Sequence, residues 1–94
     1  MAIKSFRDKR TAALFLGLPV KGLPHELRKR ARINLAILHR AGGLDDLRVL
    51  PGNRLEALKR DRAGQHSIRV NDQFRLCFQW TGTDAENAEL VDYH

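Results

Sequence analysis

The sequence predicts an α+β domain in which two N-terminal helices pack on one face of a small antiparallel sheet. Three observations predict this fold. Apolar residues recur at helical spacing in residues 27–38, they alternate with polar residues in residues 66–70 and 74–80, and the helical pattern precedes the strands. Helices followed by consecutive strands are typical of a helical layer that covers one sheet face. The opposite face is then expected to be open to a ligand. Ninety-four residues form one such domain, residues 1–94.

The first elements are expected to be a short strand and a helix. Residues 3–6 are a candidate edge strand, because they place Ile3 and Phe6 in a short segment ahead of the first helix signal. Asp8 is a suitable N-cap for a helix over Lys9–Leu16. Gly17 and then Pro19 are expected to end that helix.

The second helix is expected to begin at Pro24 and to run to about Ala41, where two glycines stop it. Its apolar stripe consists of Leu27, Ala31, Leu35 and Leu38. Four basic residues cluster near its start: Arg28, Lys29, Arg30 and Arg32. Such a cluster is most often a solvated helix face, and it also offers a docking surface to a polyanion. Residues 44–50 are spaced for a turn of helix packed on the sheet, and residues 51–53 form a turn.

Four strands are predicted to follow, at residues 54–59, 66–70, 74–80 and 88–94. Side chains alternate faces along a strand, so a one-residue slip would turn an apolar row outward. Two apolar rows are therefore expected to face the core: Ile68 and Val70 on one strand, and Phe74, Leu76, Phe78 and Trp80 on the next.

That register leaves residues 71–73 as a tight loop and places Arg69 opposite Arg75 on the polar face. Like charges across a ladder are unfavourable. Either the two arginines splay into solvent, or a polyanion lies across them. Cys77 is expected on the same polar side.

The charge is unevenly distributed. The formal net charge is +6, with eleven basic and four acidic residues in residues 1–50 and six basic and seven acidic residues in residues 51–94. This asymmetry indicates an anionic partner, with nucleic acid favoured over a membrane because no apolar stretch reaches the roughly 18–20 residues of a spanning helix. The N-terminus lacks a secretory pattern and there is one cysteine, which together predict a cytoplasmic protein.

Cofactor and metal sites are not predicted. The four histidines, His25, His39, His66 and His94, are too far apart for the close spacing of a zinc site. Glycine-rich phosphate loops and serine or cysteine nucleophile motifs do not occur in the sequence. We expect His39 to have a surface role.

The remaining polar residues suit cleavage of RNA by its own 2′-hydroxyl without a metal. That reaction needs a base for the hydroxyl, cations for the charge that develops at phosphorus, and an acid for the departing 5′-oxygen. The candidate catalytic residues are Lys59, Arg75, Asp92, Tyr93 and His94. A histidine beside Asp92 and a terminal carboxylate is favoured in its charged form, which suits an acid. The candidate RNA-binding residues are Arg54, Arg60, Arg62 and Arg69.

These residues lie in segments that resemble the HigB (killer protein) toxins of the RelE/ParE superfamily. The resemblance covers nearly the whole chain, and its most specific parts are Asn71-Asp72-Gln73-Phe74-Arg75 and the closing Asp92-Tyr93-His94. It implies a RelE-like fold, ribosome-dependent cleavage of messenger RNA, and neutralisation by a helix-turn-helix, HigA-like antitoxin. It also implies that the strand lysine, the arginine after the aromatic residue and the Asp-Tyr-His ending belong to the active site.

Two positions depart from the pattern of the family. Some relatives carry a histidine, a possible base, where this chain has Glu56, so that base is missing here. The residue after the lysine is often a glycine where this chain has Arg60, which adds charge and bulk beside the site. Our hypothesis is that the protein is a messenger RNA endoribonuclease. In it, His94 would be the general acid, and Arg75 and Lys59 would stabilise the phosphorane. Asp92 would orient His94 or serve as the base, and Tyr93 would position the RNA. The alternatives are a ParE-like inhibitor that binds DNA gyrase and a non-catalytic RNA-binding module.

Overall fold

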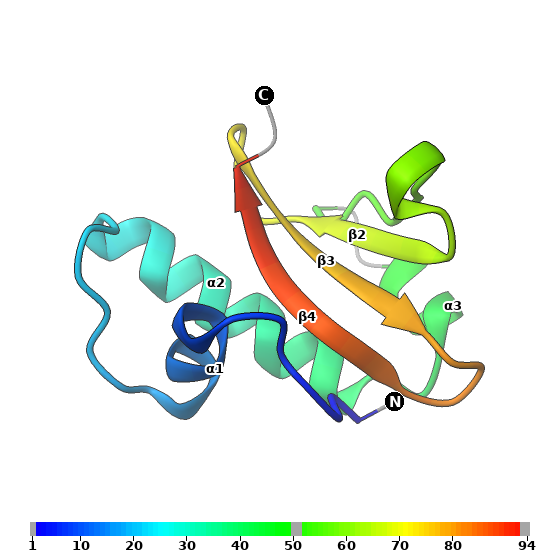
Figure 1. Ribbon diagram of the computed structural model, residues 1–94, viewed down its shortest axis with the longest axis horizontal. Helices are drawn as coiled ribbons and strands as arrows, with labels where there is room; N and C mark the ends of the chain where they lie inside the picture. Colours follow the sequence, from blue (N-terminus) through cyan, green and yellow to red (C-terminus); the bar gives the residue numbers. More distant parts are fainter. Residues whose placement is uncertain (1, 50–51, 93–94) are drawn as a thin grey trace.

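The computed structural model describes residues 2–49 and 52–92. Its elements follow the predicted order of helices and then strands, and the prediction of an α+β fold is confirmed (Figure 1). The four strands pair antiparallel in sequence order, β1-β2-β3-β4. The elements are α1 Lys9–Leu16, α2 His25–Arg40, α3 Leu44–Arg48, β1 Glu56–Ala57, the 3₁₀ turn η1 Arg60–Arg62, β2 Gln65–Arg69, β3 Phe74–Trp80 and β4 Ala85–Asp92.

The first helix has the predicted caps. The Asp8 carboxylate accepts a hydrogen bond from the Thr11 backbone N–H at 2.8 Å, and Gly17 ends the helix in the left-handed region with φ 75°. Thr11 itself is buried, and its hydroxyl accepts the Leu90 backbone N–H at 3.0 Å. This bond ties α1 directly to β4.

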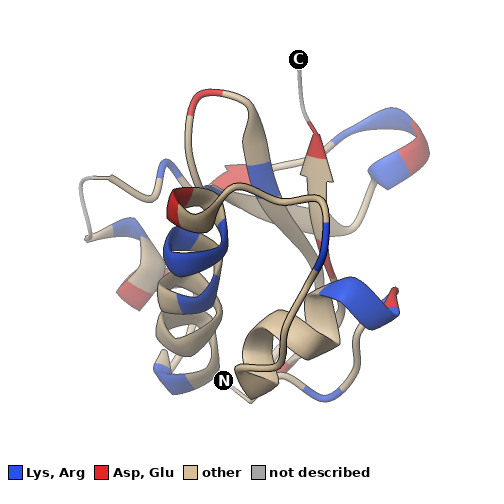
Figure 2. Ribbon diagram, turned by 90° about the vertical axis from the view of Figure 1, so that its left-hand side faces the viewer, with Lys and Arg blue, Asp and Glu red and all other residues tan. Residues whose placement is uncertain are grey.

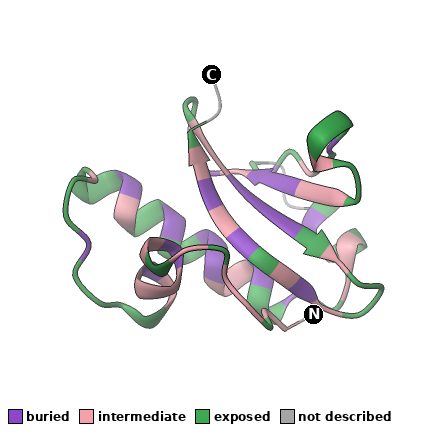
Figure 3. Ribbon diagram, viewed as in Figure 1, coloured by how far each residue is buried: buried purple, intermediate pink, exposed green. Residues whose placement is uncertain are grey.

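The second helix buries its predicted stripe against the sheet. Leu27, Ala31, Leu35 and Leu38 are all buried, and purple positions recur along one side of α2 in Figure 3. Asn34 is also fully buried within this stripe, where its side chain donates to the Arg69 carbonyl at 2.8 Å. The helical layer and the sheet are therefore joined by a polar bond as well as by apolar packing.

The register of the central hairpin is as predicted. Ile68 pairs with Leu76 and Arg69 pairs with Arg75, while the Val70 N–H donates to the Phe74 carbonyl at 3.0 Å. Ile68, Val70, Leu76 and Phe78 lie in the core, and Phe74 packs against it. Trp80 lies at the end of β3 opposite buried Ala85 and is half-buried, outside the core cluster.

The predicted bounds were wrong for three of the strands. The first contains only Glu56–Ala57, because Arg54 has a φ of 45° that is incompatible with an extended strand. The second, β2, is displaced by one residue from the predicted 66–70. The last begins three residues earlier than predicted, at Ala85, and contains a bulge at Asn87, where φ is 54°. Of the predicted 88–94 strand, Tyr93 and His94 lie outside the described residues, as do Leu50 and Pro51.

The predicted edge strand at residues 3–6 forms two isolated parallel bridges to β4, at Ile3↔Ala85 and Phe6↔Ala88. Together with the Thr11 hydroxyl, these bridges occupy the outer edge of β4 and protect it from pairing with another chain. His39, expected on the surface, is exposed, and it accepts the Ile3 N–H at 3.2 Å and packs edge-on against Phe15.

The expectation of an open second sheet face was wrong at its centre. Ser67 and Cys77 pair with each other on the side opposite the core, yet both are fully buried. Burial raises the pKa of the Cys77 thiol. The open part of this face lies toward the ends of the strands. Within residues 2–49 and 52–92, no helix is long and apolar enough to cross a membrane.

Candidate functional site

Three of the predicted basic residues meet in one hollow of about 220 Å³ on the sheet face that points away from the helices. We name it the arginine hollow. It is lined by Arg54, Glu56, Arg69, Asn71, Asp72 and Arg75. Arg69 and Arg75 reach it because they are opposite each other in the ladder, on the face that does not carry Ile68 and Leu76.

The Arg75 side chain crosses β2 to reach the segment that precedes β1. Its Nε donates to the Ser67 hydroxyl at 2.7 Å, and its Nη2 donates to the Arg54 carbonyl at 2.6 Å. The left-handed backbone of Arg54 is part of this arrangement. These two bonds fix the plane of the guanidinium, which is a condition for the paired contacts that arginine makes with phosphate.

Arg69 is held from both sides through its backbone. Its N–H donates to the Asn53 carbonyl at 2.6 Å, and its carbonyl accepts from the buried Asn34 side chain at 2.8 Å. Its guanidinium pairs with the exposed Asp72 carboxylate. The two arginines therefore avoid mutual repulsion because each has its own partners within the protein. This arrangement differs from both alternatives drawn from the sequence, which were side chains that splay into solvent and a polyanion that lies across them.

The loop between β2 and β3 closes one side of the hollow. The Asn71 carboxamide oxygen accepts the backbone N–H of Gln73 at 2.9 Å and that of Phe74 at 2.7 Å. This local bonding is typical of asparagine in tight turns, and it fixes Asn71 and Asp72 on the rim.

The other predicted basic residues do not line the arginine hollow. Lys59 and Arg60 are exposed, Lys59 as the N-cap of η1 and Arg60 with a φ of 57°. Arg62 donates to the Gln65 carboxamide and to the Glu89 carboxylate, both at 3.1 Å. Glu89 also pairs with Arg7 at 3.4 Å. Arg62 thus anchors η1 to β4.

The predicted acidic residue, Asp92, does not line the arginine hollow. Asp92 pairs with Phe74 in the ladder, so its side chain shares the face of Phe74, and it accepts a hydrogen bond from the Gln73 side chain at 3.0 Å. Tyr93 and His94 lie outside the described residues, and their roles stay predictions. In residues 2–49 and 52–92, no group of three His, Cys, Asp or Glu side chains is placed to hold a metal ion.

Three residues that support this site were not predicted from the sequence. Asn34 and Asn53 hold the backbone of Arg69, and Ser67 holds the side chain of Arg75. Asn34 carries a usable signal, since a polar residue inside an apolar helical stripe is expected to find a buried partner. Asn53 and Ser67 carry no such signal. Glu56, noted from the sequence only as the substitute for a histidine, lies inside the hollow.

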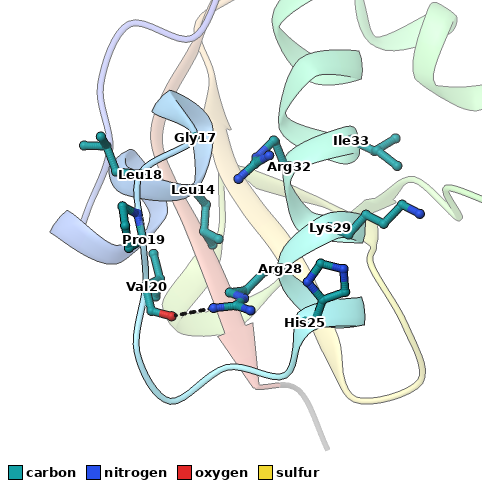
Figure 4. A pocket seen from close by; sticks show the side chains of 10 residues that line it. All are labelled: Leu14, Gly17, Leu18, Pro19, Val20, His25, Arg28, Lys29, Arg32 and Ile33. Carbon is teal, nitrogen blue, oxygen red and sulfur yellow. Dashed lines mark hydrogen bonds between the residues drawn. The ribbon is translucent and has the colours of Figure 1, made fainter.

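A second hollow lies on the helical side of the molecule, between the end of α1 and the start of α2 (Figure 4). It has a volume of about 560 Å³. Its floor is apolar, and its lining includes the exposed side chains of Leu18 and Ile33. Basic side chains line the α2 side, and Lys and Arg gather on the N-terminal half of α2 in Figure 2. They are Arg28, Lys29 and Arg32, of which Arg28 donates to the Val20 carbonyl at 3.2 Å.

Comparison with known proteins gives consistent matches. A family model described as the RelE-like toxin of the type II toxin–antitoxin system HigB matches residues 4–94. Toxin HigB-1 of Vibrio cholerae is 43% identical over 68 residues, which is 72% of each chain. Endoribonuclease HigB of Proteus vulgaris is 33% identical over an alignment of 96 residues, which covers 98% of this chain and 99% of the relative.

Proposed function

The chain belongs to the HigB family of RelE-like toxins of type II toxin–antitoxin systems, and we propose that it is an endoribonuclease that cleaves messenger RNA in the ribosomal A site. The observation that carries this proposal is the arginine hollow. Three arginines that line one hollow of about 220 Å³ are suited to the charge that develops on a phosphorane. The relative from Proteus vulgaris named as an endoribonuclease supports the same reaction.

The proposed reaction is attack by the RNA 2′-hydroxyl on the adjacent phosphorus, without a metal ion. Arg75, fixed by Ser67 and Arg54, would bind the scissile phosphate, and Lys59 would add charge from the neighbouring turn. His94 would protonate the departing 5′-oxygen, Asp92 would orient His94, and Tyr93 would position the RNA. Arg54 and Arg69, which line the hollow, would bind flanking phosphates, and the exposed Arg60 outside it would bind another.

We propose that the ribosome presents the messenger. Proteins that hold single-stranded RNA unaided combine a basic groove with several exposed aromatic residues. Here the phenylalanines Phe6, Phe15, Phe74 and Phe78 belong to the core or pack against it, which leaves the half-buried Trp80 as the one aromatic residue of the described part outside the core. Binding of free RNA is therefore expected to be weak and strongly dependent on salt. The basic start of α2 offers a surface for ribosomal RNA, and on this proposal the protein acts in the cytoplasm.

The test compares one messenger in two states at physiological salt. Purified toxin is added to naked messenger and to the same messenger loaded on ribosomes, and the new 5′ ends are mapped. We expect clear cleavage on ribosomes and little on naked RNA. Equal rates on both would refute ribosome dependence. Growth arrest without any cleavage, accompanied by inhibition of DNA supercoiling, would refute the nuclease and favour the alternative, an inhibitor of DNA gyrase.

A type II toxin has an antitoxin partner. We propose that this antitoxin is a helix-turn-helix, HigA-like protein that docks in the second hollow, between α1 and α2 (Figure 4). An apolar floor with a basic rim is complementary to an acidic, amphipathic segment. Arg32→Glu should then weaken antitoxin binding at least tenfold in calorimetry. Arg40→Glu, a matched change at the opposite end of α2, should not. Equal affinities of the two variants would move the antitoxin to another surface.

A further inference from the structure

The arginine hollow contains carboxylates as well as guanidinium groups. Its described lining has three arginines, Arg54, Arg69 and Arg75, and two acidic residues, Glu56 and Asp72. The formal charge of this lining is therefore only +1, from three positive and two negative side chains. Binding of nucleic acid depends on the number of phosphates that Lys and Arg neutralise. The two carboxylates therefore lower the attraction of the hollow for RNA.

Asp72 directly engages one of the three arginines. Its Oδ1 accepts a hydrogen bond from Nη2 of Arg69 across the turn that joins β2 and β3. A carboxylate thus occupies the guanidinium that would bind a flanking RNA phosphate. Carboxylate and phosphate oxygens make the same charge-assisted contacts with a guanidinium, so the two compete for it.

The turn keeps this carboxylate close to Arg69. The Asn71 side chain closes the turn by accepting the backbone N–H groups of Gln73 and Phe74, and the backbone of Arg69 is hydrogen-bonded on both sides. The ion pair itself faces solvent, because the Asp72 side chain is 99% exposed and the Arg69 side chain 30% exposed. An exposed ion pair contributes little to stability, so a phosphate at high local concentration can displace Asp72.

We propose that Asp72 is a specificity-determining residue that competes with RNA phosphate for Arg69 and thereby directs the toxin to messenger on the ribosome. This assignment rests on the proposed function. Free RNA must displace the carboxylate from a hollow with little excess positive charge, so free RNA binds weakly. A ribosome that presents the messenger raises the local concentration of phosphate at the hollow, and Arg69 then exchanges Asp72 for phosphate.

The first experiment measures binding of a single-stranded oligoribonucleotide whose 2′-oxygens are methylated, so that it cannot be cleaved. Fluorescence anisotropy gives Kd over a range of salt concentrations for the wild type and for Asp72→Asn. We expect Asp72→Asn to bind about three- to tenfold more tightly at about 0.1 M salt. The slope of log affinity against log salt should steepen by about 0.7, which corresponds to one more neutralised phosphate. Equal affinities of the two proteins would overturn the proposal.

Two controls separate competition for Arg69 from overall charge. Asp45→Asn removes the same charge from another exposed aspartate, which pairs with an arginine three residues later, Arg48, and does not line the hollow. It should change the affinity by less than about twofold. In an Arg69→Ala background, Asp72→Asn should lose most of its gain, because the contested cation is gone. A full gain in either control would overturn the proposal.

The second experiment measures cleavage of naked messenger and of the same messenger loaded on ribosomes. We expect Asp72→Asn to raise kcat/KM on naked messenger by about three- to tenfold, through a lower KM, and to have a smaller effect on loaded messenger. An unchanged ratio of the two kcat/KM values would overturn the assignment. Failure of the wild type to cleave loaded messenger would instead overturn the proposed function, whereas the anisotropy measurement does not depend on cleavage.

Discussion

Arg75 shows at the scale of a single residue how neighbouring groups hold a guanidinium in a fixed orientation. Its bonds to the Ser67 hydroxyl and the Arg54 carbonyl fix its plane inside the arginine hollow. Arg30 has the same charge and lies exposed on α2. We expect Arg75→Ala to lower kcat/KM on ribosome-loaded messenger by about 10²–10³-fold and Arg30→Ala to have a much smaller effect. Arg75→Lys should rescue only partly, because lysine lacks the planar fork. Equal losses at positions 30 and 75 would mean that overall positive charge suffices.

His66 is expected to make the free energy of unfolding depend on pH. Its pKa is lowered from 6.5 by burial and, to a smaller extent, by the charge of Arg48. The unfolded chain therefore binds a proton more readily than the folded protein, so the free energy of unfolding should fall as pH drops below about 6.5 and level off below the folded pKa. The decrease should be smaller in His66→Asn. Urea titrations at pH 7.5, 6.5 and 5.5 measure it, and parallel profiles for the two proteins would exclude His66 as a cause.

At the scale of elements, η1 is held on the sheet by a charge cluster. Arg62 was predicted to bind RNA, but its guanidinium is engaged by Glu89 and Gln65, while its backbone N–H donates to the Lys59 carbonyl at 3.2 Å. The Glu89 side chain is only 18% exposed. This cluster positions the turn that carries Lys59.

Replacing Glu89 by glutamine should therefore loosen η1. We expect faster hydrogen exchange at the Arg62 and Ala63 amides and a loss of about 1 kcal/mol in unfolding free energy. The control is Asp45→Asn, which breaks the pair with Arg48 at a side chain that is 92% exposed. It should change neither measurement appreciably. Unchanged hydrogen exchange in Glu89→Gln would show that Arg62 does not hold the turn. Arg62 would then again be a candidate RNA-binding residue.

At the scale of the whole molecule, Asn34 joins the helical layer to the strand that carries Arg69 of the arginine hollow. It is fully buried, and its bond to the Arg69 carbonyl connects α2 with the arginine hollow. Asn34→Ala leaves that carbonyl without its partner, so we expect a loss of about 1–3 kcal/mol in unfolding free energy, measured by urea denaturation. Ile33→Ala, at the adjacent exposed position, should cost less than about 0.5 kcal/mol. Similar losses for the two variants would mean that the interlayer bond contributes little.

Features that depend on periodicity and local chemistry could be predicted from the amino-acid sequence. The caps of α1, the buried stripe of α2, the bounds of β3 and the pairing of Arg69 with Arg75 all follow from patterns within a few residues. Such patterns specify the face on which a side chain lies, because helices and strands have fixed periods. They were sufficient to place Arg69 and Arg75 on one face, where the sequence left open solvent or a polyanion as their surroundings.

The partner of each of these side chains depends on tertiary contacts between segments that are far apart in the sequence. Arg62 is bound to Glu89, 27 residues away, and Arg75 to the Arg54 carbonyl, 21 residues away. Both contacts depend on the paths of loops that have no period, including the left-handed backbones of Arg54 and Arg60. Long side chains reach across strands into space that these loops shape. For the same reason periodicity could not show that Cys77 is buried or that Glu56 lines the same hollow as the three arginines.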